Sequence, residues 1–363
     1  DSSSSSSSSS SSFNDDELFH SFIFGSLFSI WPLHNVMTIT LPLGLGLGFG
    51  PPPPPDQLPS VDAFISSIQK CRREKDLKCA TCIHTHVCSN GIEDIGNYLV
   101  PMFVQCGSIN EAHRVFLGLV DRNEISWTSL IQGYVQSGKP EFAISLFEEM
   151  QEACIGPSIF TFMELLKACT TLKYVEKGQE VHAQIVFEGF ETNQILGNTI
   201  IDMYAKCGWL SDAWDILYNL DAQDVVSWTT LIRGYTEHGL GHEALSSYRQ
   251  MQAEGILPND VTFLCTLKAC STLKEIDMVL ALHTDIVKEG YEIKTFVSNT
   301  LLDTYAKCGF FVEAKDVFDE LLVKDIVSWN ALITGYVEYG LNEECLSCMK
   351  EMQSQHSLSL DDV

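Results

Sequence analysis

Five side chains that could bind a metal ion lie within ten residues of one another, in the stretch CATCIHTHVC at 79–88. Thiolate and imidazole groups are preferred ligands of Zn²⁺, but a structural zinc site normally combines two ligand pairs separated by a loop. His84 of this stretch also recurs as His182 and His283, in the segments VHAQIV and LHTDIV. We therefore interpret the histidine as part of a repeated structural unit, and we predict neither a metal site nor another cofactor.

Other polar and aromatic residues recur at a constant distance, which indicates an internal repeat. Three asparagines are 101 residues apart each time: Asn97, Asn198 and Asn299. Three tryptophans have the same spacing, in ISWTSLIQGY, VSWTTLIRGY and VSWNALITGY: Trp127, Trp228 and Trp329. The segments TFMELLKACTTL at 161–172 and TFLCTLKACSTL at 262–273 are again 101 residues apart. The chain is thus built from triplets of segments, which we place at 61–92, 93–123, 124–158, 159–193, 194–224, 225–259, 260–294, 295–325 and 326–360.

Each segment has the apolar spacing of two helices. In the segment 225–259, one stripe contains Leu231, Ile232 and Tyr235, and the other contains Ala244, Leu245, Tyr248 and Met251. Gly239 lies between the stripes, where the chain must turn. A helical hairpin with one apolar face cannot fold alone, whereas stacked hairpins bury their faces continuously. The repeats therefore predict an all-α fold, an α-solenoid of roughly nine helix-turn-helix units with roughly eighteen helices.

Residues 1–60 differ in kind from the repeats, because they contain a run of serines, the alternation GLGLGFG and five consecutive prolines. This composition predicts a disordered or leader segment. The span from Leu18 to Gly50 is long enough to cross a membrane, but Pro32 and Pro42 interrupt it and no lysine or arginine flanks it. These features disfavour a membrane anchor. Residues 361–363 form the C-terminal end.

The chain has 48 acidic and 22 basic side chains, a formal net charge of −26. This balance argues against an indiscriminate binder of phosphates, which normally has a basic excess. A role with nucleic acid would have to depend on local placement of charge. The thirteen cysteines are odd in number and lie mostly in apolar helical patterns, which favours free thiols in a reducing compartment.

The blocks VSWNALITGY, NTIIDMYAKCG and LKAC resemble the plant pentatricopeptide repeat family, with segments in the order long, short and ordinary repeat. Within it they are similar to the PLS subfamily, whose repeats cycle through three length variants, here without the E/DYW extension. A tetratricopeptide array is a poorer match, because its period is a constant 34 residues. The resemblance covers about 61–360. It implies a right-handed superhelix that binds single-stranded RNA in a mitochondrion or chloroplast, although no transit peptide is readable.

In this family one base is read per repeat, by the fifth and the last residue of that repeat. Carried over to this chain, the complete pairs are Asn97 with Asn123, Thr128 with Ser158, Asn198 with Asp224, Thr229 with Asn259, and Asn299 with Asp325. Asn330 is the fifth residue of the last repeat, where Leu360 takes the last position. Asparagine and aspartate at repeat ends also cap helices, so capping alone is the alternative explanation for Asp224 or Asn259.

The family's preferences turn these pairs into an expected RNA pattern. They imply uracil for Asn with Asp, adenine for Thr with Asn or Ser, and a pyrimidine for Asn with Asn. From 5′ to 3′ the pattern is pyrimidine, A, gap, U, A, gap, U. The gaps fall at 61–92, 159–193 and 260–294, which correspond to the family's long variant and are called the long repeats here. Their fifth residues cannot hydrogen-bond a base: Ile65, Met163 and Leu264.

Two further sets of site residues follow from the resemblance. The second residue of a repeat wedges an apolar side chain between bases, which points to Ile125, Val226, Phe296 and Val327. Ordinary core packing is the alternative for these four. Lys206 and Lys307 end the first helix in YAKCG and are candidate phosphate contacts, with a solvated lysine as the alternative. Gln105 takes their place in the first short repeat.

The family's catalytic members carry a deaminase-like domain with an HxE motif and a downstream CxxC. This chain has CxxC at Cys345 and Cys348 but no HxE, and we expect it not to be an enzyme. Its expected role is that of a specificity factor in the editing or processing of organellar RNA, with any enzyme supplied by another protein. The alternative is a scaffold for protein–protein interaction, which the net negative charge and the apolar fifth residues of the long repeats would suit.

Overall fold

The structure, a computed structural model, describes residues 61–90 and 95–358, in which it contains eighteen α-helices. The first helices of the hairpins are α2 Val61–Glu74, α4 Gly96–Gln105, α6 Glu124–Gln136, α8 Ile159–Leu172, α10 Gln194–Cys207, α12 Val225–Glu237, α14 Asp260–Leu273, α16 Thr295–Cys308 and α18 Ile326–Glu338. The second helices are α3 Leu77–Asn90, α5 Ile109–Leu117, α7 Pro140–Glu152, α9 Val175–Phe187, α11 Leu210–Asn219, α13 Gly241–Ala253, α15 Ile276–Lys288, α17 Phe311–Glu320 and α19 Asn342–Leu358. The leader expected at 1–60, with its apolar span, lies outside the described residues.

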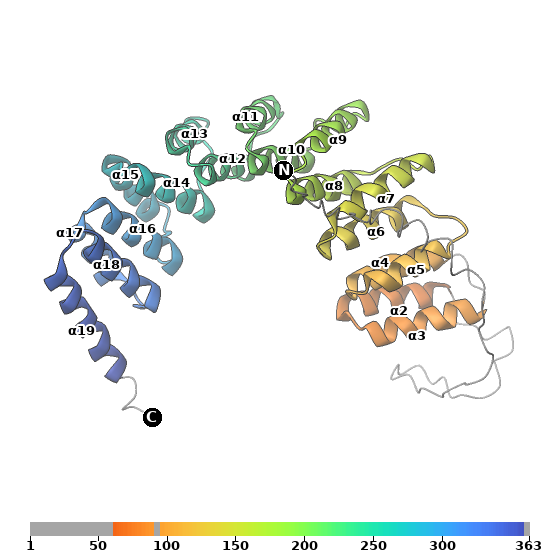
Figure 1. The fold of residues 1–363 in the computed structure, drawn as a ribbon, viewed down its shortest axis with the longest axis horizontal. Coiled ribbons are helices and arrows are strands. Elements are labelled where there is room, and N and C mark those ends of the chain that lie inside the picture. Colours follow the sequence, from red (N-terminus) through yellow and green to blue (C-terminus); the bar gives the residue numbers. More distant parts are fainter. Residues whose placement is uncertain (1–60, 91–94, 359–363) are drawn as a thin grey trace, which may run out of the picture. The chain divides into compact units, whose positions relative to one another are not determined.

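The eighteen helices of the described residues form two layers (Figure 1). Each first helix packs against the second helix of its own hairpin and against the first helices on either side, as α16 does with α14, α17 and α18. We call the even-numbered helices α2 to α18 the first-helix row, and the odd-numbered helices α3 to α19 the second-helix layer. The expected all-α solenoid of stacked helix pairs is confirmed.

Most first helices begin at a polar side chain that caps the free backbone amides of the first turn. The Asp325 carboxylate accepts a hydrogen bond from the Ser328 amide at 2.8 Å, and Asn123 accepts one from the Ser126 amide at 3.1 Å. Other side chains cap in the same way: Ser158, Asn193, Asp224 and Asn259. The polar residue before each of these helices therefore helps to define where the helix starts.

The tryptophan block, VSWTTLIRGY in α12, and the YAKCG block of the preceding repeat recur together because they pack against each other. Trp228 of VSWTTLIRGY is buried and meets Trp214 edge to face, with ring centroids 5.8 Å apart. Six residues on, a Cβ added at Gly234 would lie 2.7 Å from the Cβ of Ala205, which belongs to the preceding YAKCG block. Glycine at this position lets α12 approach α10 closely, and Gly335 repeats the contact one triplet later.

Histidines of the second helices hydrogen-bond to tyrosines in the first helix of the next hairpin. The Nδ1-to-hydroxyl distances are 2.6 Å for His113 and Tyr134, 3.2 Å for His182 and Tyr204, and 3.0 Å for His283 and Tyr305. His84 instead packs edge to face on Phe103. Within the described ranges no three His, Cys, Asp or Glu side chains are grouped to hold a metal ion. No helix in the same ranges has the length and apolar character to cross a membrane.

Candidate nucleic-acid interface

The predicted base-reading pairs lie at boundaries within the first-helix row. The fifth residue of a repeat lies in the first or second turn of its first helix, and the last residue lies just before the next first helix. Because neighbouring first helices are in contact, the two side chains of a pair come from adjacent helix ends. The pairs differ in how closely they meet.

Asn299 and Asp325 are in direct contact. The Asn299 Nδ2 donates to Asp325, at 3.1 Å from Oδ1 and 3.2 Å from Oδ2. The hydrogen bond from the Ser328 amide, joined by that from Asn299, holds the pKa of the Asp325 carboxyl below its usual value. Asn299 is 6% exposed, and its Oδ1 has no hydrogen-bond partner among the described residues. A buried acceptor without a donor is costly, which makes this oxygen a candidate binding group.

A pocket between α16 and α18 surrounds this pair. It contains the predicted base-reading, wedging and phosphate residues of the last two repeats, in one place: Phe296, Asn299, Lys307, Asp325, Val327 and Asn330. Leu360, the expected partner of Asn330, lies outside the described residues. The pocket thus joins amide and carboxylate groups, two exposed apolar side chains and a cation.

Asn198 and Asp224 repeat this arrangement with looser contact. The Asn198 Nδ2 lies 3.5 Å from both carboxylate oxygens of Asp224. The side chain of Gln194, one turn earlier on α10, donates to the Asn198 Oδ1 at 3.4 Å. The Oδ1 of Asn198 therefore has a hydrogen-bond donor, whereas the Oδ1 of Asn299 has none among the described residues.

Thr229 and Asn259 are linked through a third residue, Thr262. The Thr262 hydroxyl donates to the Asn259 Oδ1 at 2.9 Å and accepts from the Asn259 amide at 3.2 Å. Its one proton is used in this way, so the Thr229 hydroxyl, 2.6 Å away, donates to Thr262. Thr229 is 6% exposed and keeps only acceptor capacity, while the side-chain NH₂ of Asn259 remains available as a donor.

The two pairs nearest the N-terminus, Asn97 with Asn123 and Thr128 with Ser158, are connected less directly. Thr128 lies 2.6 Å from the Thr161 hydroxyl, which in turn lies 3.2 Å from that of Ser158, and Thr128 also donates to Glu124 at 3.1 Å. Asn97 and Asn123 meet through the backbone. The Asn123 amide donates to the Asn97 Oδ1 at 3.3 Å, and the Asn97 Nδ2 donates to the Asp121 carbonyl at 3.0 Å.

The predicted wedging residues are about half exposed, at 46% for Ile125, 50% for Val226, 49% for Phe296 and 56% for Val327. Core packing alone does not explain apolar side chains with this exposure. Three more residues at the same repeat position are also exposed and were missed by the sequence reasoning: Phe160, Ile195 and Val261. Their place as second residues of their repeats was the signal that could have found them.

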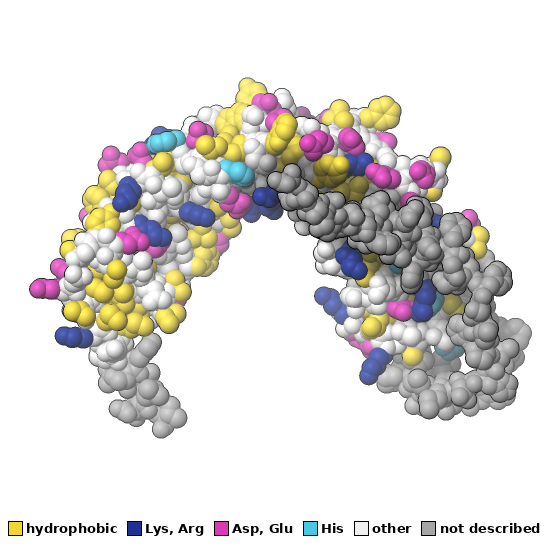
Figure 2. Space-filling view, in the orientation of Figure 1, with side chains coloured by type: hydrophobic (Ala, Val, Ile, Leu, Met, Phe, Trp, Pro, Cys, Tyr) yellow, Lys and Arg dark blue, Asp and Glu magenta, His cyan; other side chains and the backbone are white. Residues whose placement is uncertain are grey.

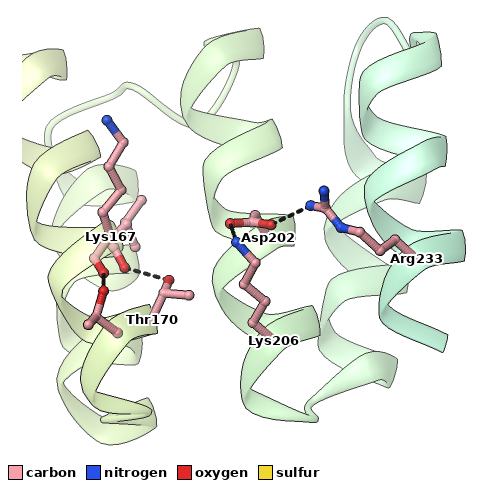
Figure 3. A network of polar contacts seen from close by, with 7 residues as sticks. Lys167, Thr170, Asp202, Lys206 and Arg233 are labelled. Atoms are coloured by element: carbon pink, nitrogen blue, oxygen red, sulfur yellow. Dashed lines mark hydrogen bonds and ion pairs between the residues drawn. The ribbon is translucent and has the colours of Figure 1, made fainter. Parts of the chain in front are cut away.

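The two predicted phosphate contacts are paired within the protein. Lys206 lies 2.8 Å from Asp202, and Lys307 lies 2.7 Å from Asp303. Arg233, from the neighbouring helix α12, also approaches Asp202 at 2.8 Å, so one carboxylate lies between two cations (Figure 3). Arg233 was not predicted, although it occupies the same place in its repeat as Asp202 does in the preceding one.

The negative charge of the chain is unevenly divided between the layers. The helices of the first-helix row contain eight basic and nine acidic residues, whereas those of the second-helix layer contain seven basic and nineteen acidic residues. Acidic side chains gather visibly over α7 and α9 (Figure 2). The first-helix row is therefore close to neutral in a strongly acidic molecule.

Comparison with known proteins gives a consistent result. The PPR repeat family matches residues 122–171 and 223–272, and the PPR repeat matches 198–221, 296–326 and 327–356. A chloroplastic pentatricopeptide repeat-containing protein of Arabidopsis thaliana is 35% identical over 301 residues, 82% of this chain and 49% of that protein. A mitochondrial one from the same plant is 32% identical over 295 residues, 80% of this chain and 38% of that protein.

Among solved structures, the fold is similar to that of the pentatricopeptide repeat protein PPR10 in complex with an 18-nt psaJ RNA element. The TM-score is 0.62 at 18% identity, over 77% of this chain and 43% of that one. This chain spans half or less of the length of each of these relatives.

Proposed function

Because the chain belongs to the pentatricopeptide repeat family, we propose that its first-helix row binds single-stranded RNA in a sequence-selective way. PPR10, whose fold it shares, is bound to an RNA element in its crystal structure. The near-neutral charge of the first helices reduces the objection that a net charge of −26 raises against binding a polyanion. Among the described helices, the acidic excess lies in the second-helix layer.

The observation that carries the proposal is the contact between Asn299 and Asp325 in the pocket of α16 and α18. One hydrogen of the Asn299 NH₂ is bound by Asp325, which leaves the second hydrogen as a donor and the Oδ1 as an acceptor. A pyrimidine edge offers the complementary groups, which in uracil are the N3–H and a carbonyl oxygen. We assign uracil to this repeat. We also assign uracil to the equivalent pair at Asn198 and Asp224, where the base would take the place of Gln194 at the Asn198 Oδ1.

The pair of Thr229 and Asn259 presents different groups. Thr229 offers an acceptor, because its proton is bound by Thr262, and Asn259 offers the side-chain NH₂ as a donor. The amino group and N1 of adenine match an acceptor followed by a donor. Adenine at this repeat agrees with the family's preference, and so does adenine at the pair of Thr128 and Ser158.

The remaining groups have supporting roles. The exposed second residues, such as Val226 and Phe296, are suited to lie between successive bases, since stacking on apolar and aromatic side chains tolerates any base. Lys206, Lys307 and Arg233 are placed to exchange their carboxylate partners for phosphate oxygens. The RNA then runs with its bases towards the N-terminal ends of the first helices.

In the cell we assign the protein to a mitochondrion or a chloroplast, the compartments in the names of its relatives. There it would act without chemistry of its own, and direct an editing or processing enzyme supplied by another protein to the RNA that it selects.

Binding to a nine-nucleotide RNA, one per repeat, tests this function. The sequence 5′-CCACUACUC-3′ contains the expected bases with cytosine at the gaps and at both ends, and 5′-CAUCAUCAC-3′ exchanges every read base. In an equilibrium titration we expect at least about tenfold tighter binding of the first RNA, since each mismatched base costs about 1 kcal/mol or more. Equal affinity for both RNAs would refute sequence-selective binding.

A protein scaffold is the second candidate, because strongly exposed apolar side chains lie at the C-terminal ends of acidic second helices. Examples are Phe187, the last residue of α9, 87% exposed, and Leu322, just after α17, 90% exposed. A pull-down in the presence of RNase separates the two functions. Partners that depend on RNA are lost after RNase treatment, whereas the partners of a scaffold are retained.

A further inference from the structure

Three lysines in the structure have a backbone conformation that L-residues rarely adopt. The φ angles are +52° for Lys75, +53° for Lys173 and +57° for Lys274. Each lysine directly follows the first helix of a long repeat, at the end of α2, α8 or α14. Among the described residues only one other non-glycine residue, Cys154, has positive φ.

Lysine is an unusual choice for this position. A helix that ends in the left-handed conformation normally uses glycine there, because a Cβ is disfavoured. The short repeats follow this rule, since Gly208 and Gly309 end α10 and α16 with φ of +86° and +82°. Three long repeats with lysine at the same strained position indicate that the side chain itself is required.

The lysines lie beside the C-terminal ends of the first helices of the following short repeats. Burial raises the pKa of the Cys207 thiol at the end of α10, and the charge of nearby Lys173 opposes this rise. The Lys274 Nζ lies 3.3 Å from the Tyr339 hydroxyl, which donates to the Lys307 carbonyl at 2.9 Å. Lys274 is thus next to the end of α16 that carries Lys307.

Lys75 has the same kind of neighbourhood at the first triplet. It lines a pocket at the ends of α4 and α6, together with the polar side chains of Gln105, Gln136 and Ser137. Lys75 and Lys173 form no ion pair with any other described residue, in contrast to Lys206 and Lys307, which are held by aspartates. The long repeats therefore add a cation without a carboxylate partner at the C-terminal edge of the first-helix row.

We infer that Lys75, Lys173 and Lys274 bind backbone phosphates of the RNA where it crosses the long repeats. This inference rests on the proposed function. The fifth residues of these repeats, Ile65, Met163 and Leu264, offer no hydrogen bond to a base, so a long repeat binds the RNA by its backbone alone. The lysine also offsets the partial negative charge of the helix C-terminus, which would otherwise repel a phosphate.

The experiment replaces all three lysines by glycine and measures affinity for 5′-CCACUACUC-3′ over a range of salt concentrations. Each phosphate contact to single-stranded nucleic acid contributes about 0.7 to the slope of log K against log salt. We expect the triple variant to lose about 2 from this slope. At 0.15 M salt the affinity should fall about fourfold for each lysine, and about fiftyfold in total.

Matched variants separate the charge from the backbone conformation. Cys154→Gly relieves the same backbone conformation without a change of charge, and Lys350→Gln removes an exposed lysine from the second-helix layer. Both should bind RNA like the wild type. Replacing the three lysines by arginine should restore the affinity. The thermal unfolding midpoint of the glycine variant should not fall, since glycine is favoured at positive φ.

The outcomes distinguish this inference from the proposed function. A wild type that binds the RNA selectively, with a glycine variant of equal affinity and salt slope, overturns the role of the lysines alone. A glycine variant that loses thermal stability but no affinity shows that the lysines only cap their helices. A wild type that binds no RNA overturns both proposals.

Discussion

The carboxylates of Asp224 and Asp325 each have two kinds of partner, a backbone amide of the following helix and the side-chain amide of the asparagine at the fifth position of the same repeat. The first contact caps a helix and the second belongs to the proposed reading pair. Capping alone would account for an aspartate at the last position of the repeat, because asparagine, aspartate and serine are about equally good helix caps. The two roles can be separated by substitution.

Asp325→Asn keeps the cap, because the amide oxygen still accepts from Ser328, so the free energy of unfolding should change by less than about 0.5 kcal/mol. Asp325→Ala removes the cap and should cost about 1 kcal/mol. Urea unfolding measures both. In RNA titrations Asp325→Asn should nevertheless weaken the preference for uracil over cytosine at the last read position. An unchanged preference, with the expected stabilities, would leave the carboxylate with the role of a cap only.

At the scale of helices, the array depends on close approach between neighbours in the first-helix row. Gly234 and Gly335 face the Cβ atoms of Ala205 and Ala306 with no room for a further methyl group. Hydrogen bonds between histidines and tyrosines, such as His182 and Tyr204, join a second helix to the first helix of the next hairpin. Both contacts cross from one repeat to the next, so they transmit stability along the solenoid.

Gly234→Ala should therefore destabilise the protein by about 1–3 kcal/mol, as overpacking of a tight interface does. The matched control is Gly156→Ala, because a Cβ at Gly156 meets nothing within 4 Å. Chemical denaturation compares the two variants with the wild type. Equal stability of both variants would show that α10 and α12 do not pack as closely as described.

Burial lowers the pKa of the imidazoles of His113, His182 and His283 below the usual value. The unfolded chain then takes up protons first as the pH falls. The stability that these residues contribute is present above about pH 6.5, the usual pKa of histidine, and is lost as the pH falls through the lowered pKa of the folded state.

Thermal melts between pH 7.5 and 5 should show this loss, and it should be smaller in the triple His→Gln variant. His242, exposed on α13, provides the control substitution. A triple variant with the wild-type pH profile would contradict the linkage.

The sequence was sufficient for the fold because the helical periodicity and the spacing of Trp127, Trp228 and Trp329 repeat over the whole array. It also identified the polar pairs, because they occupy the fifth and the last position of their repeats. It could not show that Thr262 orients the Thr229 hydroxyl, that Gln194 covers Asn198, or that Arg233 shares a carboxylate with Lys206. Those contacts join different turns or repeats, and they depend on side-chain geometry that no spacing specifies.

For the molecule as a whole, the division of charge between the layers matters more than the net charge. A second-helix layer whose helices contain nineteen acidic and seven basic residues disfavours the binding of nucleic acid to that layer. The acidic residues would then suppress non-specific binding and leave selective binding to local contacts.

Exchanging Glu141, Glu149 and Glu152 of α7 for glutamine tests this role of the acidic layer. We expect affinity for the non-matching RNA 5′-CAUCAUCAC-3′ to rise several-fold at 0.05 M salt and the gain to disappear at 0.5 M, where charges are screened. Titrations at the two salt concentrations measure both effects. An equal gain at high salt would mean that the effect is not electrostatic.

The most direct measurement of the central claim is the base preference of one repeat before and after its reading pair is exchanged. The substitutions Asn299→Thr and Asp325→Asn convert the pair to the type found at Thr229 and Asn259 while they keep a helix cap. We predict that the variant prefers adenine to uracil at the eighth nucleotide of 5′-CCACUACUC-3′, with preferences elsewhere unchanged. A variant that still prefers uracil there, as the wild type should, would contradict the claim that these paired side chains read the RNA.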